Sequence, residues 1–422
     1  MLHTEVWRQF RELVLTGFTA ALATSTAQAQ EQESYRGNPA STTRIQRAAD
    51  APKANSDAAT GYPKISFDTL ASVDLSGLSS STGPDRGPGA TLWSDSTFLV
   101  EFNDTLSLAG LLQVKPRAPL PADDPNKDLF INRGPGRKEG GKMKELYLRY
   151  GNWRVGKFVP DFGRAYALLP GPYSSDFIEE PEQGYEPSDM LGVEKIHVFN
   201  NENGGWRQLS VTAFMVDRTF LHESFPYNEG IIHLGDGGVG NTRFPENISV
   251  TYDVLNQRAG HWGHLSYQAG VIRWGKSVGE ERGEWWSTLG ADLSIPLNGS
   301  VADTLSARYS QFHFYVEAAR RDNFKGIAGR TRQFLSGSAE YMRGPLVFDL
   351  TTAHRWTTDR ILPLQKDASY TATIAYTLPS QTILSLSAAH ETVGAEKGFY
   401  TGLRVTHTFT TCSKCIARGS YY

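Results

Sequence analysis

Period-two alternation of apolar and polar side chains recurs along most of the chain, and it limits the possible folds more than any other feature. The clearest segment is 369–378, in which Tyr370 and Ile374 fall on one face of an extended strand and Thr371 and Thr373 on the other. Successive side chains of a strand point to opposite faces, and helical spacing does not explain these segments. The sequence therefore predicts an all-β protein whose strands each have one apolar and one polar face.

Sixteen segments carry this alternation, and the connections between them alternate in length. The predicted strands are 64–76, 91–103, 104–115, 143–151, 152–159, 190–200, 205–216, 246–256, 261–274, 284–295, 303–317, 331–343, 344–357, 368–379, 381–393 and 398–409. Tight turns such as Gly151-Asn152 follow the even-numbered strands, whereas longer connections such as 116–142 and 160–189 mostly follow the odd-numbered ones. This asymmetry is typical of a transmembrane antiparallel β-barrel with short periplasmic turns and long extracellular loops. A soluble sandwich or propeller has no reason to keep it.

The amino-terminal segment predicts export to the outer membrane of a Gram-negative cell. Arg8 and Arg11 precede an apolar run at 13–23, and Ala27-Gln28-Ala29 forms a small-x-small cleavage site, the arrangement of a secretory signal peptide. The following segment lacks apolar periodicity, which indicates a flexible periplasmic leader. The expected divisions are a signal peptide at 1–29, the leader at 30–63, the barrel at 64–409 and a carboxy-terminal tail at 410–422.

Composition narrows the class of protein further. After the signal segment no stretch approaches the roughly 18 consecutive apolar residues of a spanning helix. Lys plus Arg number 42 against 45 Asp plus Glu, a net charge of −3, which gives no electrostatic case for a nucleic-acid partner. Hydrophobic residues make up only 39% of the chain while aromatic residues reach 11%. A barrel with a wet interior and outer-membrane lipid around it accounts for both values.

The polar register predicts which charged side chains line the lumen. The acidic candidates are Asp68, Asp74, Glu101, Glu145, Asp253, Asp292, Glu340 and Asp349. The basic candidates are Lys115, Arg149, Arg154, Lys195, Arg308, Arg332, Arg355 and Arg404. Because the two sets are equal in number, the wall as a whole favours neither sign of ion. Pairing of acids with bases across neighbouring strands for stability is the alternative to an ion-specific role.

The long connection 160–189 is the candidate constriction. Its charged residues are Asp161, Asp176, Glu179, Glu180, Glu182, Glu186 and Asp189, with Arg164 as the only base. If this loop folds inward, it places a cation-favouring narrowing in the pore. If it stays on the surface, its carboxylates simply face water. Both arrangements fit the residues.

These features predict a porin-like channel for passive diffusion of small hydrophilic solutes or ions, with weak selectivity. The alternative is a barrel plugged by segment 217–245 that acts as a surface-binding or structural protein. The sequence contains no G-x-S-x-G, P-loop or H-E-x-x-H motif, so we expect neither an enzyme nor a cofactor. Cys412 and Cys415 are too few ligands for a structural metal site, and in the oxidising periplasm they predict at most a disulfide.

One short motif resembles a known family. Gly151-Asn152-Trp153-Arg154-Val155-Gly156-Lys157-Phe158, followed by Pro160 and Phe162-Gly163, is similar to the G-x-x-R-x-G-[QK]-F-x-x-P-F-G stretch of phosphate-selective porins of the O and P type. The proline lies one place earlier here. The resemblance implies a sixteen-stranded outer-membrane channel that assembles as a homotrimer. Those porins hold anions with arginine and lysine ladders, and the balanced charges of this chain depart from that pattern.

Overall fold

The computed structural model describes residues 62–81, 89–114, 141–165, 184–200, 206–225, 231–260, 263–298, 310–360, 364–380 and 382–413. Within these ranges no helix is long and apolar enough to cross a membrane. The expected signal peptide and nearly all of the leader lie outside them. So do Lys115, Arg308, most of the loop 116–142, Asp176, Glu179, Glu180 and Cys415.

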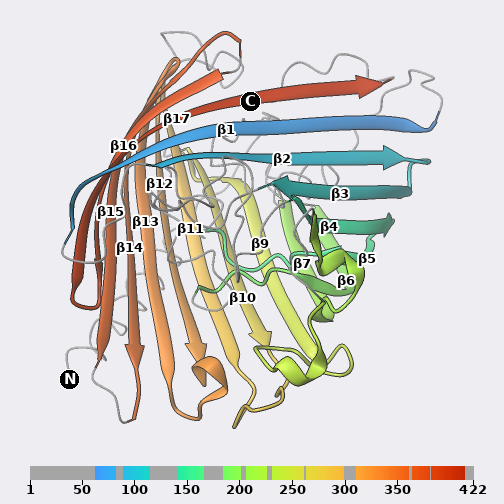
Figure 1. Cartoon of the computed structure of the whole chain (residues 1–422). Helices are drawn as coiled ribbons and strands as arrows, with labels where there is room; N and C mark the ends of the chain where they lie inside the picture. Colours follow the sequence, from blue (N-terminus) through green and yellow to red (C-terminus); the bar gives the residue numbers. More distant parts are fainter. Residues whose placement is uncertain are drawn as a thin grey trace.

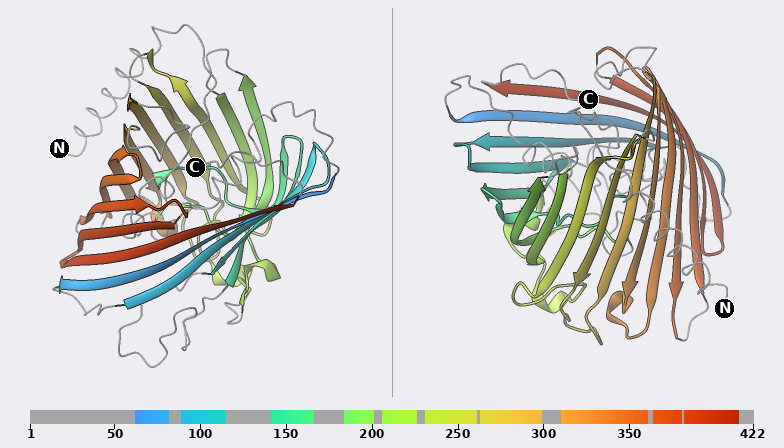
Figure 2. Two further views of the ribbon diagram at one scale, coloured as in Figure 1. Left: turned by 90° about the horizontal axis from the view of Figure 1, so that it is seen from above. Right: turned by 180° about the vertical axis from the view of Figure 1, so that it is seen from behind.

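The described residues form one antiparallel sheet that closes on itself. Its strands are β1 (Lys64–Ser81), β2 (Gly89–Glu101), β3 (Leu106–Val114), β4 (Gly141–Tyr150), β5 (Trp153–Phe158), β6 (Met190–Asn200), β7 (Trp206–Val216), β8 (Ser224–Phe225), β9 (Asn247–Arg258), β10 (His264–Arg273), β11 (Trp285–Asn298), β12 (Ser310–Asp322), β13 (Thr331–Arg343), β14 (Leu346–Thr358), β15 (Gln365–Thr377), β16 (Thr382–Val393) and β17 (Glu396–Ser413). β1 pairs with both β2 and β17, which closes the ring. Figure 1 shows red β17 beside blue β1, and Figure 2 shows the ring from above.

Closure leaves the described sheet without an edge strand, which a bilayer requires because hydrocarbon cannot hydrogen-bond a free backbone. The outward register is correspondingly apolar: Leu350 is 64% exposed and Leu386 is 56% exposed. Water would penalise so many exposed apolar side chains, whereas lipid does not. The predicted transmembrane barrel of 16 antiparallel strands is therefore confirmed, with β8 as an additional two-residue pairing at the edge of β4.

Several predicted strand boundaries differ from the structure, those of β12 and β17 among them. β12 begins at Ser310 and continues to Asp322, whereas the alternation predicted a strand at 303–317. β17 continues to Ser413, where the backbone lies opposite Ile65 of β1. Residues 410–413 therefore belong to the barrel instead of to the predicted tail, because the long β1 offers them a pairing edge.

β5 leaves the barrel wall early, and this departure shapes the interior. The strand has 6 residues, and the chain turns into the barrel after Phe158. Gly156 permits the twist: its φ is +136°, and a Cβ there would lie 2.5 Å from the carbonyl oxygen of Leu146. The edge of β4 that β5 abandons pairs with β8 instead, with Gly141 opposite Phe225.

Buried ion pairs close the seam between β4, β5 and β8. The Lys157 ammonium is fully buried and lies 3.0 Å from Asp217 Oδ2 and 3.2 Å from Asp189 Oδ1. It also donates to the carbonyl oxygen of Leu221 at 2.8 Å. Burial raises the pKa of the Asp189 carboxyl, but Lys144, Lys142 and Lys157 together outweigh burial and hold that pKa well below its ordinary value. Lysines and aspartates thus replace the hydrogen bonds that a longer β5 would make.

Replacing Lys157 by methionine is expected to lower the free energy of unfolding by roughly 3–5 kcal/mol, because Asp217 loses its buried ion-pair partner and Asp189 keeps only Lys142 and Lys144. The loss should be full at neutral pH and shrink below about pH 4, where an ordinary Asp takes up a proton. Thermal unfolding across this pH range measures it. Lys195→Met, at a lysine of β6 that takes no part in these ion pairs, is the control. If Lys157→Met and wild type unfolded at the same temperature at pH 7, the buried ion pairs of Lys157 would not stabilise the barrel.

Candidate functional site in the barrel lumen

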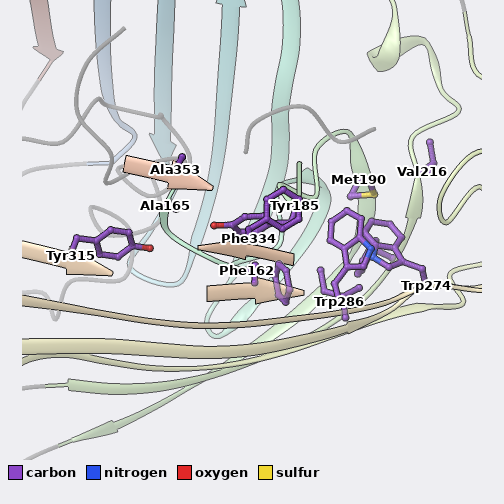
Figure 3. Packing of buried hydrophobic residues seen from close by; sticks show 13 residues of the cluster. Phe162, Ala165, Tyr185, Met190, Val216, Trp274, Trp286, Tyr315, Phe334 and Ala353 are labelled. Atoms are coloured by element: carbon purple, nitrogen blue, oxygen red, sulfur yellow. The ribbon is translucent and has the colours of Figure 1, made fainter. Parts of the chain in front are cut away.

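A loop enters the barrel after β5 and leaves it before β6. We call the described parts of this connection, 159–165 and 184–189, the lumenal loop. Phe162 and Tyr185 are 0% and 1% exposed, and they pack in an apolar cluster with inward side chains of the wall. The Tyr185 ring lies 4.9 Å from the ring of Phe334, and Phe162 lies 6.2 Å from Trp286 (Figure 3). Both parts of the loop therefore lie inside the barrel.

A buried carboxylate on β12 holds the first part of the lumenal loop. Glu317 Oε2 accepts the backbone N–H of Arg164 at 2.7 Å, and Oε1 accepts that of Ala165 at 3.1 Å. The Tyr185 hydroxyl donates to the same carboxylate. Gly163 has φ +72°, and a Cβ there would lie 2.9 Å from the Tyr185 ring. Glycine is therefore required at this bend.

Arg321, four residues further along the same face of β12, holds the second part. Its Nη1 donates to the carbonyl oxygen of Gly184 at 2.5 Å, and Nη2 lies 3.0 Å from Glu284 Oε2. The guanidinium also stacks 4.3 Å from the Trp286 ring and 4.6 Å from the Phe324 ring. β12 thus holds both parts of the lumenal loop. Glu317 accepts hydrogen bonds from N–H and O–H groups of the loop, and Arg321 donates one to a carbonyl oxygen of the loop.

Arg164 places the positive charge of the loop among acids of the wall. Its guanidinium forms an ion pair with Asp253 of β9, and Nη1 lies 3.3 Å from Asp292 Oδ1 of β11. Gln268 Nε2 donates to Asp253 at 2.9 Å and to Asp161 at 3.1 Å. Burial, and then the neighbouring Asp253, raise the pKa of Asp161 well above its ordinary value. This cluster contains three acids and one arginine.

Most predicted lining residues that the structure describes lie on the inward register. These are Asp68, Asp74, Glu101, Glu145, Arg149, Arg154, Asp253, Asp292, Arg332, Glu340, Asp349, Arg355 and Arg404. Several pair across strands: Arg355 Nε donates to Asp367 Oδ2 at 2.8 Å, and Arg404 Nη2 donates to Asp74 Oδ2 at 2.7 Å. Such pairs keep the wall charge balanced. Within the described ranges, no group of three or more His, Cys, Asp or Glu side chains could hold a metal ion.

Lys195 is a correction, because the structure places it on the outer face. It lies opposite Trp153 in the strand register, and its Nζ is 5.1 Å from the centre of the Trp153 ring. Trp153 is 45% exposed on the same face as Val155. The position is close to the tight turn at Gly151-Asn152, so the lysine stem can cover apolar surface while the ammonium reaches the lipid headgroups.

The alternation along the sequence did not single out the residues that hold the lumenal loop. Glu317 stood at the end of the predicted strand 303–317, and Arg321 stood beyond it. The available signal for a longer strand was the period-two spacing that continues past the predicted end. It places Tyr315, Glu317, Ala319 and Arg321 on one face. The polar register also predicted a polar lumen, whereas the inner wall has an apolar cluster where the loop packs.

No protein-family model matches the chain, and no curated protein matches it either. Solved structures do. The outer membrane channel DcaP of Acinetobacter baumannii is 13% identical, with 82% of this chain and 97% of that chain covered and a TM-score of 0.55. OprB of Pseudomonas putida is 11% identical, with 90% of this chain and 100% of that chain covered and a TM-score of 0.50. The fold is thus that of outer-membrane porins.

Proposed function

We propose that the chain is an outer-membrane channel for passive diffusion of small hydrophilic solutes or ions. The observation that carries this proposal is the lumenal loop, which Glu317 and Arg321 of β12 hold inside the barrel. A barrel of about sixteen strands encloses more space than side chains fill, so porins of this size keep an aqueous channel. A loop fixed against one side of that space narrows it without needing to move.

The selectivity is weak or mildly in favour of cations. Paired acids and bases on the wall contribute little net charge, as Arg355 with Asp367 and Arg404 with Asp74 illustrate. The cluster around Arg164 supplies a modest acidic excess beside the loop. Asp161, Arg164, Asp176, Glu179 and Glu180 remain the constriction candidates. We also propose that the protein assembles as a homotrimer, because the stretch from Gly151 to Phe158 resembles that of trimeric phosphate-selective porins.

Single-channel recording in planar bilayers tests the channel directly. Purified protein is expected to give stepwise ion currents whose reversal potential in a salt gradient lies near zero or slightly on the cation side. Addition of a heat-unfolded sample, matched in detergent, is the control. Folded protein that inserts without current steps would favour the plugged, surface-binding alternative instead.

A further inference from the structure

The outer face of the barrel has a groove across β12 to β17. Its volume is about 650 Å³, within the range of roughly 300–1,000 Å³ that suits small-molecule sites. Ala339, Ala372 and Ala388 are the alanines of its lining, while Phe348 and Leu386 are large neighbours. Lipid-facing positions of a barrel are usually filled by larger apolar side chains, so alanines here leave a hollow in the surface.

An aromatic patch lies beside this groove, toward the end of β14 that is away from the tight turn at Gly344, on the same outward register of β14 and β15. His354 stacks on Trp356 with ring centroids 5.7 Å apart and an interplanar angle of 7°. Tyr370 meets His354 edge-on at 5.4 Å and is 52% exposed. Aromatic side chains with a polar atom favour the level of lipid headgroups. The patch therefore marks the end of the apolar groove on this side, at the level where lipid headgroups begin.

A lysine lies beside the aromatic patch, and we call the groove, the patch and this lysine together the track. Lys366 lies opposite Trp356 in the register and is exposed at the amino-terminal end of β15. Its neighbour Asp367 points into the lumen, where it binds Arg355. No ion pair in the described part of the chain neutralises Lys366. Six residues separate it from Ala372, a span of about 20 Å along a strand.

We propose that this track binds one lipid with an anionic phosphate headgroup. The phosphate lies at Lys366, the polar aromatic patch contacts the ester region, and an acyl chain occupies the groove beside Ala372 and Ala388. Charge complementarity at one end of an apolar groove favours a lipid over a second copy of the barrel, whose apolar surface would leave the lysine unused. The proposal requires the barrel to lie in a bilayer, but not to conduct.

The test measures lipid binding to the folded barrel. Wild type and variants are placed in nanodiscs of phosphatidylcholine, with or without added phosphatidylglycerol, and thermal unfolding and the lipid retained in native mass spectrometry are recorded. Lys366→Gln should weaken phosphatidylglycerol binding about fivefold. Ala388→Leu should displace retained lipid by filling the groove. Lys195→Gln changes the outer-face lysine beside Trp153 and should bind phosphatidylglycerol like wild type. Inorganic phosphate alone should not raise the thermal unfolding temperature.

Each other result rejects the lipid site. Equal retention by Lys366→Gln and Lys195→Gln would show that the cation has no special place. If Ala388→Leu abolished chemical cross-linking between barrels while lipid retention stayed unchanged, a second copy would be the occupant. Protection by inorganic phosphate would indicate a free anion site. Ion currents are expected to be the same in wild type and all three variants, so failure of this proposal is distinguishable from failure of the channel.

Discussion

Replacing Glu317 by alanine is expected to raise the single-channel conductance, because the lumenal loop loses its anchor on β12. The carboxylate accepts the backbone N–H groups of Arg164 and Ala165 and the hydroxyl of Tyr185. Each buried donor left without an acceptor costs roughly 1–3 kcal/mol, so the loop gains by moving toward water. Movement of residues 159–165 toward the mouth of the barrel withdraws them from the lumen, which widens its cross-section.

A graded series separates anchoring from a general loss of stability. Glu317→Gln keeps one carbonyl acceptor and should fall between wild type and Glu317→Ala. Glu340→Ala removes a lumenal carboxylate of β13 that makes none of these contacts, so its conductance should stay near that of wild type. A Glu317→Ala channel with the wild-type conductance and noise would show that packing alone holds the loop.

The apolar cluster sets the limit of this effect. Phe162 and Tyr185 keep their contacts with Trp286 and Phe334 when Glu317 is changed, and a fully buried aromatic side chain contributes about 1.5–3 kcal/mol. Arg321 also keeps its hydrogen bond to Gly184. We therefore expect partial release with fluctuating current, and a full opening only when Arg321 is replaced as well.

The barrel was predictable because lipid and water impose opposite demands on alternate residues. Segment 369–378 illustrates this: β15 places Tyr370 and Ile374 outward and Thr371 inward, as the alternation predicts. The same reasoning was wrong for Lys195. A lysine near a strand end satisfies its charge in the headgroup region, so its polarity does not reveal the face on which it lies.

The interior was less predictable because tertiary contacts replace water there. Phe214 and Trp286 share the inward register with polar residues, where they pack against Trp274, and Phe162 of the incoming loop packs against Trp286. β8 was also missed. Two residues carry no periodicity, and their pairing with β4 exists only because β5 leaves the wall. Both features depend on the path of one long connection, which local patterns do not determine.

Replacing Arg164 by glutamine is expected to shift the reversal potential toward the cation side. The side chain neutralises Asp253 and Asp292, whereas its backbone N–H, which binds Glu317, is unchanged by the substitution. Charge and anchoring are therefore separable at this one residue. Loss of the arginine leaves an acidic cluster beside the lumenal loop, and fixed negative charge attracts cations.

The pH dependence gives a second readout with a definite sign. The pKa of Asp161 is raised by burial and by Asp253, so its carboxyl gains negative charge only as pH rises through that higher value. Cation preference in Arg164→Gln should consequently grow with pH and diminish in acid. Arg404→Gln also removes one lumenal positive charge, but its partner is Asp74 on β1, away from the loop. It should shift the reversal potential less. If both variants shifted it equally, net lumenal charge would determine selectivity without any contribution from the loop.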